Sequence, residues 1–310
     1  MKVAVFGGTG FIGSYVVEAL LDGGHDPVLL VREGSEQKVV RKDECRIVIG
    51  HIADEESVKK TLSDSEAVIY LLGIIREFRR KGITYEALHF AGAKECMKKA
   101  QKFGVRRFLL MSANGVKPEG TGYQITKYLA DEYLKTTDLE YTIFRPSLVF
   151  GDPKGQNRPE FCTHLRDQLI RLPLPAPLFY SGLLPNDAGK FKMSPVYVKD
   201  IAAIIAQSLE KKETIGQIYE LGGPENPDWK TIIKIIGRAV GKNKWTVPAP
   251  AFGIKLVAAL FDRFAFFPIT REQITMLMEG NCCDSKEIFE LFGMKPTCFD
   301  KKFLSYLLAV

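Results

Sequence analysis

Short apolar runs alternate with longer amphipathic stretches through the first half of the chain. The apolar runs predict strands at 3–6, 27–31, 46–49, 67–72, 108–111 and 141–144. The stretches between them predict helices at 11–21, 54–62, 84–103 and 123–136. Strands that are apolar along their length and alternate with helices are typical of a parallel sheet covered on both faces. The first half therefore predicts an α/β domain with a doubly wound parallel sheet.

The pattern changes after Pro146. Residues 151–195 are rich in proline and glycine, which favours loops, and from Asp228 onward the pattern is mostly helical. Between these regions a strand at 195–198, a helix at 200–209 and a strand at 217–221 return to the first pattern. We therefore expect one domain from 1–150 with 191–224 returning to it. Residues 151–190 and 225–310 are expected to form a smaller, mostly helical C-terminal lobe that holds a substrate or acts as a lid.

A glycine-rich loop joins the first strand to the first helix. Its sequence, Gly7-Gly8-Thr9-Gly10-Phe11-Ile12-Gly13, fits both G-x-x-G-x-x-G from Gly7 and G-x-G-x-x-G from Gly8. In either pattern one glycine makes a tight turn, Gly10 lets the backbone approach a pyrophosphate, and Gly13 lets helix and strand pack closely. The helix N-terminus then presents N–H groups and a positive dipole end to the phosphates. This context predicts a Rossmann domain that binds a dinucleotide.

The residue after the second strand bears on which nucleotide is bound. NAD-binding Rossmann domains usually place an acidic residue there to accept the ribose hydroxyls. In this chain the residue is Arg32, and a guanidinium can bind a 2′-phosphate through two hydrogen bonds. The sequence therefore favours NADP(H). Glu33 adjoins it and keeps NAD(H) as an alternative, in which Arg32 stacks on the adenine or is solvated.

Tyr123 and Lys127 lie four residues apart at the start of a predicted helix, so they share one helix face. A nearby ammonium lowers the pKa of a phenol, and we expect Tyr123 to exchange a proton with a carbonyl or alcohol near neutral pH. The lysine can also bind the nicotinamide ribose. The alternative is a surface tyrosine beside a solvated lysine.

Composition adds little to this picture. With 46% hydrophobic and 26% charged residues, the 310-residue chain can bury a core without disulfides or metal. Its six cysteines form no CxxC pair, so we expect no metal site and a reducing compartment. The net charge of +6 comes without a nucleic-acid motif, so no nucleic-acid partner is expected. No apolar run reaches the ~18 residues of a membrane span. The first strand begins almost at Met1, where a signal peptide would lie, so we expect a cytoplasmic protein, or at most one attached peripherally to a membrane.

Motifs along nearly the whole chain resemble those of the extended and atypical short-chain dehydrogenase/reductases, the NAD-dependent epimerase/dehydratase-like proteins. The subgroup that the chain most resembles contains the NADPH-binding accessory subunit of respiratory complex I and its bacterial relatives. The matching segments are 7–13, 71–75, 111–113, Tyr123 with Lys127, 144–151, 195–200 and 219–225.

The resemblance implies a role for several residues. Thr9, Gly10, Phe11 and Ile12 would contact the pyrophosphate, and Leu72 and Gly73 would flank the adenosine. Residues 146–148, with Pro146 and Leu148, would border the nicotinamide. Family members often carry an aspartate near the adenine after the third strand, and here that place reads His51-Ile52, so that Ile52 would contact the adenine.

The resemblance also leaves one catalytic residue in question. Family members pair the tyrosine with a serine or threonine that polarises the substrate carbonyl. In this chain that place falls at Ala113 or Asn114, and Ser112 comes one or two residues early. Ser112 can serve only if the loop is shifted.

Three functions follow from these residues. The first is an NADP(H)-dependent oxidoreductase or epimerase acting on a carbonyl or secondary alcohol, with Tyr123 as acid/base. The second is a non-catalytic protein that holds NADP(H) for structure, assembly or sensing within a larger complex. A sugar-nucleotide epimerase ranks third because it usually needs the displaced serine. The apolar stretch 250–267 would line a hydrophobic substrate site, pack as a lid, or touch a membrane or a quinone-bearing partner.

Overall fold

The computed structural model describes residues 1–155, 158–253 and 270–308. The chain forms two compact units. The first comprises Met1–Pro146, Val198–Leu221 and Lys286–Lys295, and the second comprises Ser147–Tyr197, Gly222–Ser285 and Pro296–Val310. Lys286–Lys295 therefore joins the first unit, whereas the sequence pattern places all of 225–310 in the second lobe.

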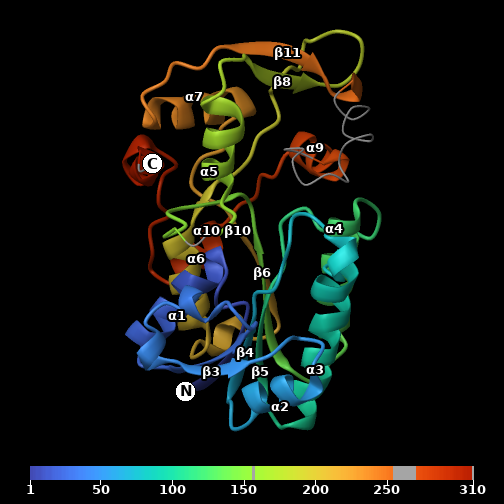
Figure 1. Ribbon diagram of the computed structural model, residues 1–310, viewed down its shortest axis with the longest axis vertical. Coiled ribbons are helices and arrows are strands. Elements are labelled where there is room, and N and C mark those ends of the chain that lie inside the picture. Colours follow the sequence, from blue (N-terminus) through green and yellow to red (C-terminus); the bar gives the residue numbers. More distant parts are fainter. Residues whose placement is uncertain (156–157, 254–269, 309–310) are drawn as a thin grey trace. The chain divides into compact units, whose positions relative to one another are not determined.

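A seven-stranded sheet forms the centre of the first unit (Figure 1). The strand order is β10-β6-β5-β4-β1-β2-β3, and every neighbouring pair is parallel. The connections reverse direction between β1 and β4, and in doubly wound sheets ligands bind at the carboxyl ends of the strands at this point. The predicted parallel sheet is confirmed, with strands β1 (Lys2–Phe6), β2 (Asp26–Val31), β3 (Arg46–Ile49), β4 (Ala67–Tyr70), β5 (Arg107–Met111), β6 (Glu140–Pro146) and β10 (Gln217–Leu221).

Helices cover both faces of this sheet (Figure 1). One face packs against α2, α3 and α4 around a core that includes Phe6, Tyr70 and Phe108. The other face is covered by α1 and α6, which pack against each other. Asp54 caps α2 as predicted, because its carboxylate accepts a hydrogen bond from the Ser57 N–H. The helices of this unit are α1 (Phe11–Asp22), α2 (Glu55–Leu62), α3 (Gly92–Lys102), α4 (Gly122–Lys135), α6 (Val198–Ser208) and α10 (Lys286–Leu291).

The helix predicted at 84–103 is interrupted. Its first part, Glu86–Ala91, is a π-helix, and α3 begins only at Gly92. In the widened turn the Leu88 carbonyl accepts a hydrogen bond of 2.7 Å from the Tyr70 hydroxyl. A Cβ at Gly92 would lie 2.9 Å from the same hydroxyl, so a glycine is needed there. Hydrophobic periodicity does not reveal this interruption, and π-turns are frequent at functional sites.

The second unit has its own apolar core, which includes Phe150, Trp229 and Phe299. The Trp229 indole N–H donates to the Pro177 carbonyl at 2.9 Å. The helical elements are α5 (Phe161–Leu165), the π-helix Arg166–Ile170, α7 (Trp229–Ala239), α9 (Arg271–Glu279) and the 3₁₀ helix Lys301–Leu308. The strands form two parallel pairs, β7 (Val149–Phe150) with β9 (Val196–Tyr197), and β8 (Ala176–Tyr180) with β11 (Thr246–Pro250).

The pair β8–β11 is not predicted by the sequence pattern, which indicates loops and helices there. Pro177 lies in β8, and Pro248 and Pro250 lie in β11. Proline cannot donate a ladder hydrogen bond and is confined to edge strands. In a two-stranded sheet both strands are edges, so these prolines are tolerated while they conceal the strands in the sequence.

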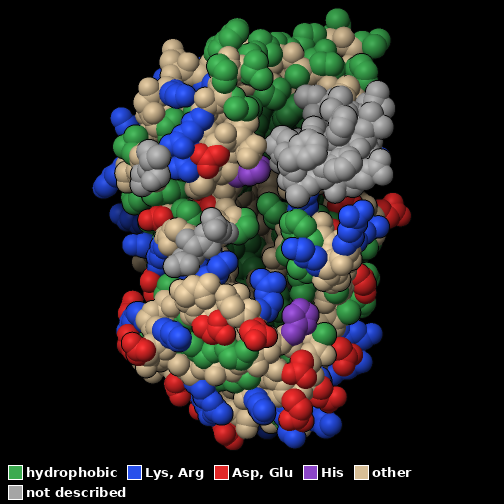
Figure 2. Space-filling model, in the orientation of Figure 1, with side chains coloured by type: hydrophobic (Ala, Val, Ile, Leu, Met, Phe, Trp, Pro, Cys, Tyr) green, Lys and Arg blue, Asp and Glu red, His purple; other side chains and the backbone are tan. Residues whose placement is uncertain are grey.

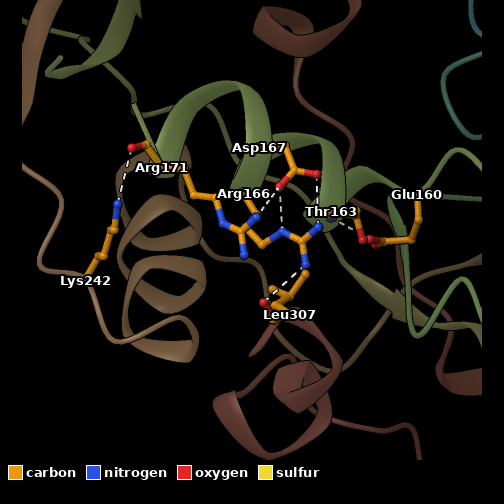
Figure 3. Close-up of polar contacts among 7 residues, drawn as sticks. All are labelled: Glu160, Thr163, Arg166, Asp167, Arg171, Lys242 and Leu307. Carbon is orange, nitrogen blue, oxygen red and sulfur yellow. Dashed lines mark hydrogen bonds and ion pairs between the residues drawn. The ribbon is translucent and has the colours of Figure 1, made fainter. Parts of the chain in front are cut away.

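Polar contacts fasten α5 and the following π-helix (Figure 3). The Glu160 carboxylate caps α5 by accepting hydrogen bonds from the Cys162 and Thr163 N–H groups at 2.9 and 2.6 Å. The Arg166 guanidinium donates to Asp167 and to the Leu307 carbonyl, the latter at 3.2 Å. This arginine therefore links the helical stretch to the C-terminal 3₁₀ helix.

Candidate nucleotide and catalytic site

The glycine loop follows the Gly7, Gly10, Gly13 pattern. Gly7 has φ +98°, a conformation that side chains rarely adopt, and its carbonyl accepts a hydrogen bond of 3.0 Å from the Gly10 N–H. A Cβ at Gly13 would lie 2.1 Å from the Gly7 carbonyl oxygen. Gly8 has ordinary φ and packs beneath the loop, where a Cβ would lie 3.1 Å from Leu29. Backbone atoms of the turn therefore pack directly against one another, and the start of α1 lies against the end of β1.

The N-terminus of α1 is suited to a phosphate group. Gly10 occupies the N-cap position without a side-chain cap, and the first turn contains no acidic residue. The first N–H groups of a helix have no acceptor within the helix, and the dipole is positive at this end. The residues at this turn, Thr9, Phe11 and Ile12 among them, therefore fit a pyrophosphate.

The other predicted nucleotide contacts lie on neighbouring strands. Arg32 follows β2, and its side chain is exposed. Within the described residues no carboxylate forms an ion pair with it. Ile52 follows β3, and its side chain packs into the core of the first unit. Pro146 ends β6 in the first unit, whereas Leu148 lies in the second unit against that unit's core.

Lys127 connects α4 to the strand ends. A capping box between Thr121 and Gln124 fixes the start of α4. The buried Lys127 ammonium donates to the Met111 carbonyl at 2.9 Å, at the end of β5. It also lies 3.6 Å from where a Cβ on Gly73 would stand, in the loop after β4. The Lys127 ammonium therefore lies against the loop after β4, which contains Gly73 and Ile74.

Burial controls the protonation of both predicted catalytic residues. It lowers the pKa of Lys127 to about 8, although nearby Asp131 opposes this shift. It raises the pKa of Tyr123 to about 12. The expectation of a lowered pKa for this phenol is therefore wrong, because burial disfavours the charged phenolate. The Lys127 nitrogen is 5.8 Å from the centre of the Tyr123 ring.

Ser112 lies beside Asp131 of α4. Ser112 is buried, and its hydroxyl makes no well-formed hydrogen bond. Burial raises the pKa of Asp131, and the nearby Ser112 hydroxyl opposes this rise. Asp131 is eight residues after Tyr123 on α4, which is ~12 Å along a helix. Asp131 also forms an ion pair of 2.9 Å with Arg145. Ser112 therefore belongs to a buried polar layer, and Ala113 and Asn114, the two positions expected for the family serine, follow it along the chain.

His89 is a residue of this site that the sequence analysis does not identify. Its Nε2 accepts a hydrogen bond of 3.0 Å from the Ile74 N–H. Its Nδ1 lies 3.2 Å from the Thr126 hydroxyl, which donates to the Gly122 carbonyl, so the ring is neutral and protonated on Nδ1. Burial and Lys127 lower the pKa of His89 to about 2. The imidazole also packs edge-on against the Tyr123 ring, at 5.2 Å between centroids.

His89 therefore holds the loop after β4 against α4. Only the π-helix of residues 86–91 marks this position, and neither the pattern of apolar residues nor a motif does. Replacing His89 with alanine removes both hydrogen bonds and the ring contact with Tyr123. We expect the free energy of unfolding to fall by about 2–4 kcal/mol. Urea unfolding measures this loss, and His51→Ala, at an exposed position, should change stability by less than about 0.5 kcal/mol. Equal losses for both variants would contradict the role given to His89.

The apolar stretch 250–267 lies outside the described residues from position 254 onward. No helix in the part of the chain that the structure describes is long and apolar enough to cross a membrane.

Comparison with known proteins shows the family to which this chain belongs. The NAD(P)H-binding family model matches residues 7–163, just over half of the chain. Subunit 9 of the NADH dehydrogenase 1 alpha subcomplex of Arabidopsis thaliana is 30% identical over 71% of this chain and 53% of its own length. The NADH-ubiquinone oxidoreductase 40 kDa subunit of Neurospora crassa is 24% identical over 94% of this chain and 75% of its own length.

Two further relatives are named as enzymes. The ceramide reductase of Caulobacter vibrioides is 23% identical over 85% of this chain and 78% of its own length. The solved structure of UDP-glucose 4-epimerase from Thermotoga maritima superposes with a TM-score of 0.73 at 19% identity, over 99% of this chain and 97% of that one. This structural likeness establishes the fold. Together with the glycine loop and the seven-stranded sheet, these matches show that the chain belongs to the NAD(P)H-binding family and is an extended, epimerase-like short-chain dehydrogenase/reductase.

Proposed function

We propose that this protein is an NADP(H)-dependent oxidoreductase that acts on a carbonyl or secondary-alcohol substrate with Tyr123 and Lys127 as its catalytic pair. The observation that carries this proposal is the placement of Lys127. Its buried ammonium lies between the Met111 carbonyl and the Gly73 loop, one helical turn after the partly exposed Tyr123. A buried charge in this position is costly unless it serves a ligand or a reaction.

Each part of the nucleotide has residues that fit it in the first unit. The N-terminus of α1 would hold the pyrophosphate, Arg32 a 2′-phosphate, and Lys127 the nicotinamide ribose. When bound, the nicotinamide gives or accepts a hydride. The protein supplies orientation and the proton.

The pKa values favour reduction. With a pKa of about 12, the Tyr123 phenol is protonated at neutral pH and can donate a proton to the substrate oxygen. Lys127, with a pKa of about 8, is mostly charged at neutral pH and stabilises the phenolate that this step leaves behind. Asn114 is one of the two positions expected for the family serine, and its side-chain amide would polarise the carbonyl in place of the hydroxyl.

The first test is to identify the nucleotide that co-purifies with the protein and to time its exchange against labelled NADPH. Exchange within seconds, together with turnover of hydrophobic ketones or aldehydes, supports the oxidoreductase. Nucleotide that stays bound for hours, with no turnover, contradicts it.

The second outcome would support a different function, that of a protein that holds NADP(H) within a larger assembly. The burial of Ser112 beside Asp131 favours this alternative, because the hydroxyl that would polarise a carbonyl then belongs to a buried polar layer. Two relatives with the names of NADH dehydrogenase subunits also favour it. Such a protein should unfold at a higher temperature when the nucleotide is bound. The sugar-nucleotide epimerase stays the third choice, since it depends most on the missing serine.

Preference for NADP(H) is tested at Arg32. Replacing Arg32 with glutamine should weaken NADPH binding about 10- to 100-fold, the value of one or two charge-assisted hydrogen bonds, and should change NADH binding little. Titration calorimetry with both nucleotides measures the two affinities. Arg46→Gln is the matched control. Arg46 is also exposed, but it lies at the amino end of β3, whereas Arg32 follows the carboxyl end of the neighbouring strand β2. Equal losses for NADPH and NADH would show that Arg32 does not bind the 2′-phosphate.

A further inference from the structure

Large apolar side chains are exposed around the small sheet β8–β11 of the second unit. Leu183 is 97% exposed, Leu184 66%, Leu174 64% and Trp245 63%. Single exposed apolar residues are common, but a cluster of this size on one small element marks an interaction site. We call the following residues the β8–β11 patch: Leu172, Leu174, Leu183, Leu184, Trp245 and Val247.

The strand pairing places the patch residues at the two ends of one small sheet. Thr246 pairs with Ala176, and the Ala176 N–H donates to the Trp245 carbonyl at 2.9 Å, so Trp245 lies beside the segment that carries Leu172 and Leu174. Leu183 and Leu184 follow the other end of β8 in a loop that returns through a hydrogen bond from the Gly189 N–H to the Phe179 carbonyl. Figure 2 shows hydrophobic side chains gathered over β8 and β11.

Positive charge surrounds this patch. Residues 229–253 contain no Asp or Glu but five cations, Lys230, Lys234, Arg238, Lys242 and Lys244. The first three are exposed and spaced four residues apart, so they line one face of α7. Lys242 and Arg171 lie next to each other, since the Lys242 ammonium donates to the Arg171 carbonyl at 3.2 Å (Figure 3). Asp187 is the one acidic residue in the loop and strand of 171–190, which also contains Lys190.

We infer that the β8–β11 patch docks on an anionic lipid surface. Exposed leucines can enter the boundary between headgroups and acyl chains, and tryptophan favours that boundary. Lysine and arginine beside such a surface each strengthen binding on the order of fivefold through attraction to anionic headgroups. The patch has both components. Within 171–190 and 229–253 the one acidic residue is Asp187, and Asp167 forms an ion pair of 3.5 Å with Arg171. The patch belongs to the second unit, and the nucleotide-binding loop belongs to the first.

The full-length protein tests this inference by co-sedimentation with vesicles. We expect binding to vesicles of equal parts phosphatidylcholine and phosphatidylglycerol and little binding to phosphatidylcholine alone. The double variant Leu183→Ser/Leu184→Ser should lose at least tenfold in vesicle affinity and keep NADPH binding, which also shows that it is folded. Lys230→Glu/Lys234→Glu should weaken binding to the anionic vesicles by a similar factor. Leu129→Ser, an exposed leucine on α4 of the first unit, is the control and should bind like the wild type.

Three results would overturn the inference. The first is no binding to anionic vesicles. The second is equal binding by the wild type and the double leucine variant. The third is a lipid-free dimer that the leucine substitutions dissociate, because a second copy of the chain would then cover the patch.

Discussion

Gly13→Ala is expected to abolish tight nucleotide binding. The added Cβ would lie 2.1 Å from the Gly7 carbonyl oxygen and 2.9 Å from Gly8 Cα, both backbone atoms that cannot rotate away. Helix α1 must therefore move away from the end of β1. Its first N–H groups then no longer point to the phosphate position that the glycine loop creates. We expect NADPH affinity to fall at least 100-fold, which corresponds to about 2.7 kcal/mol or more.

The same overlap should destabilise the protein without nucleotide, by about 1–3 kcal/mol as for other overpacked sites. Urea unfolding without nucleotide and calorimetric titration with NADPH separate the two effects. Gly253→Ala is the control, because among the described residues a Cβ there meets nothing within 4 Å and φ is ordinary. Normal NADPH affinity in Gly13→Ala would show that the phosphates bind elsewhere.

This glycine loop is the part of the site that sequence best predicts, because its chemistry is local. Strand, turn and helix follow one another within the first residues, so the spacing of Gly7, Gly10 and Gly13 already implies their contacts. The sequence leaves open whether Gly7 or Gly8 begins the pattern. The φ of +98° at Gly7 answers this question.

The strands of the main sheet are also predicted nearly to the residue, since a buried parallel strand needs a continuous apolar run. Contacts between segments far apart in the chain are not predicted. His89 binds the Ile74 N–H fifteen residues before it, through a π-helix that sequence periodicity conceals. Ser112 has the right residue type near the expected position, but its neighbours Asp131 and Arg145 come from later elements and draw it into a buried layer.

The pKa values, too, depend on contacts that sequence does not predict. A lysine one turn from a tyrosine suggests from sequence that the phenol is acidified. Desolvation depends on everything that packs around the pair, and it raises the pKa of Tyr123 to about 12. Lys127 lies in a small hollow whose lining includes Tyr70, His89 and Asp131. Burial among these residues lowers the pKa of Lys127 to about 8 although a carboxylate lies nearby.

Tyr123→Phe is expected to slow carbonyl reduction by about 10²–10⁴-fold, the usual contribution of a positioned proton donor. The substitution removes only the hydroxyl, and the ring can keep its edge-on contacts with Tyr85 and His89. NADPH affinity and stability should therefore stay near the wild-type values. Single-turnover oxidation of bound NADPH with a substrate found by screening measures the chemical step. Tyr128→Phe, on the same helix, is the control and should react at the wild-type rate.

The pH dependence distinguishes the two members of the pair. Tyr123 stays protonated up to about pH 12, so it does not limit reduction in the usual range. Lys127 loses its charge as the pH rises through about 8, so the rate of reduction should fall above that pH. Lys127→Met should remove this fall and give a slow, pH-independent rate, because no ammonium is left to titrate. If neither Tyr123→Phe nor Lys127→Met alters the rate, the pair is not catalytic. If the wild-type protein reduces no substrate and yet retains NADPH, the role of Lys127 is instead to hold the nucleotide.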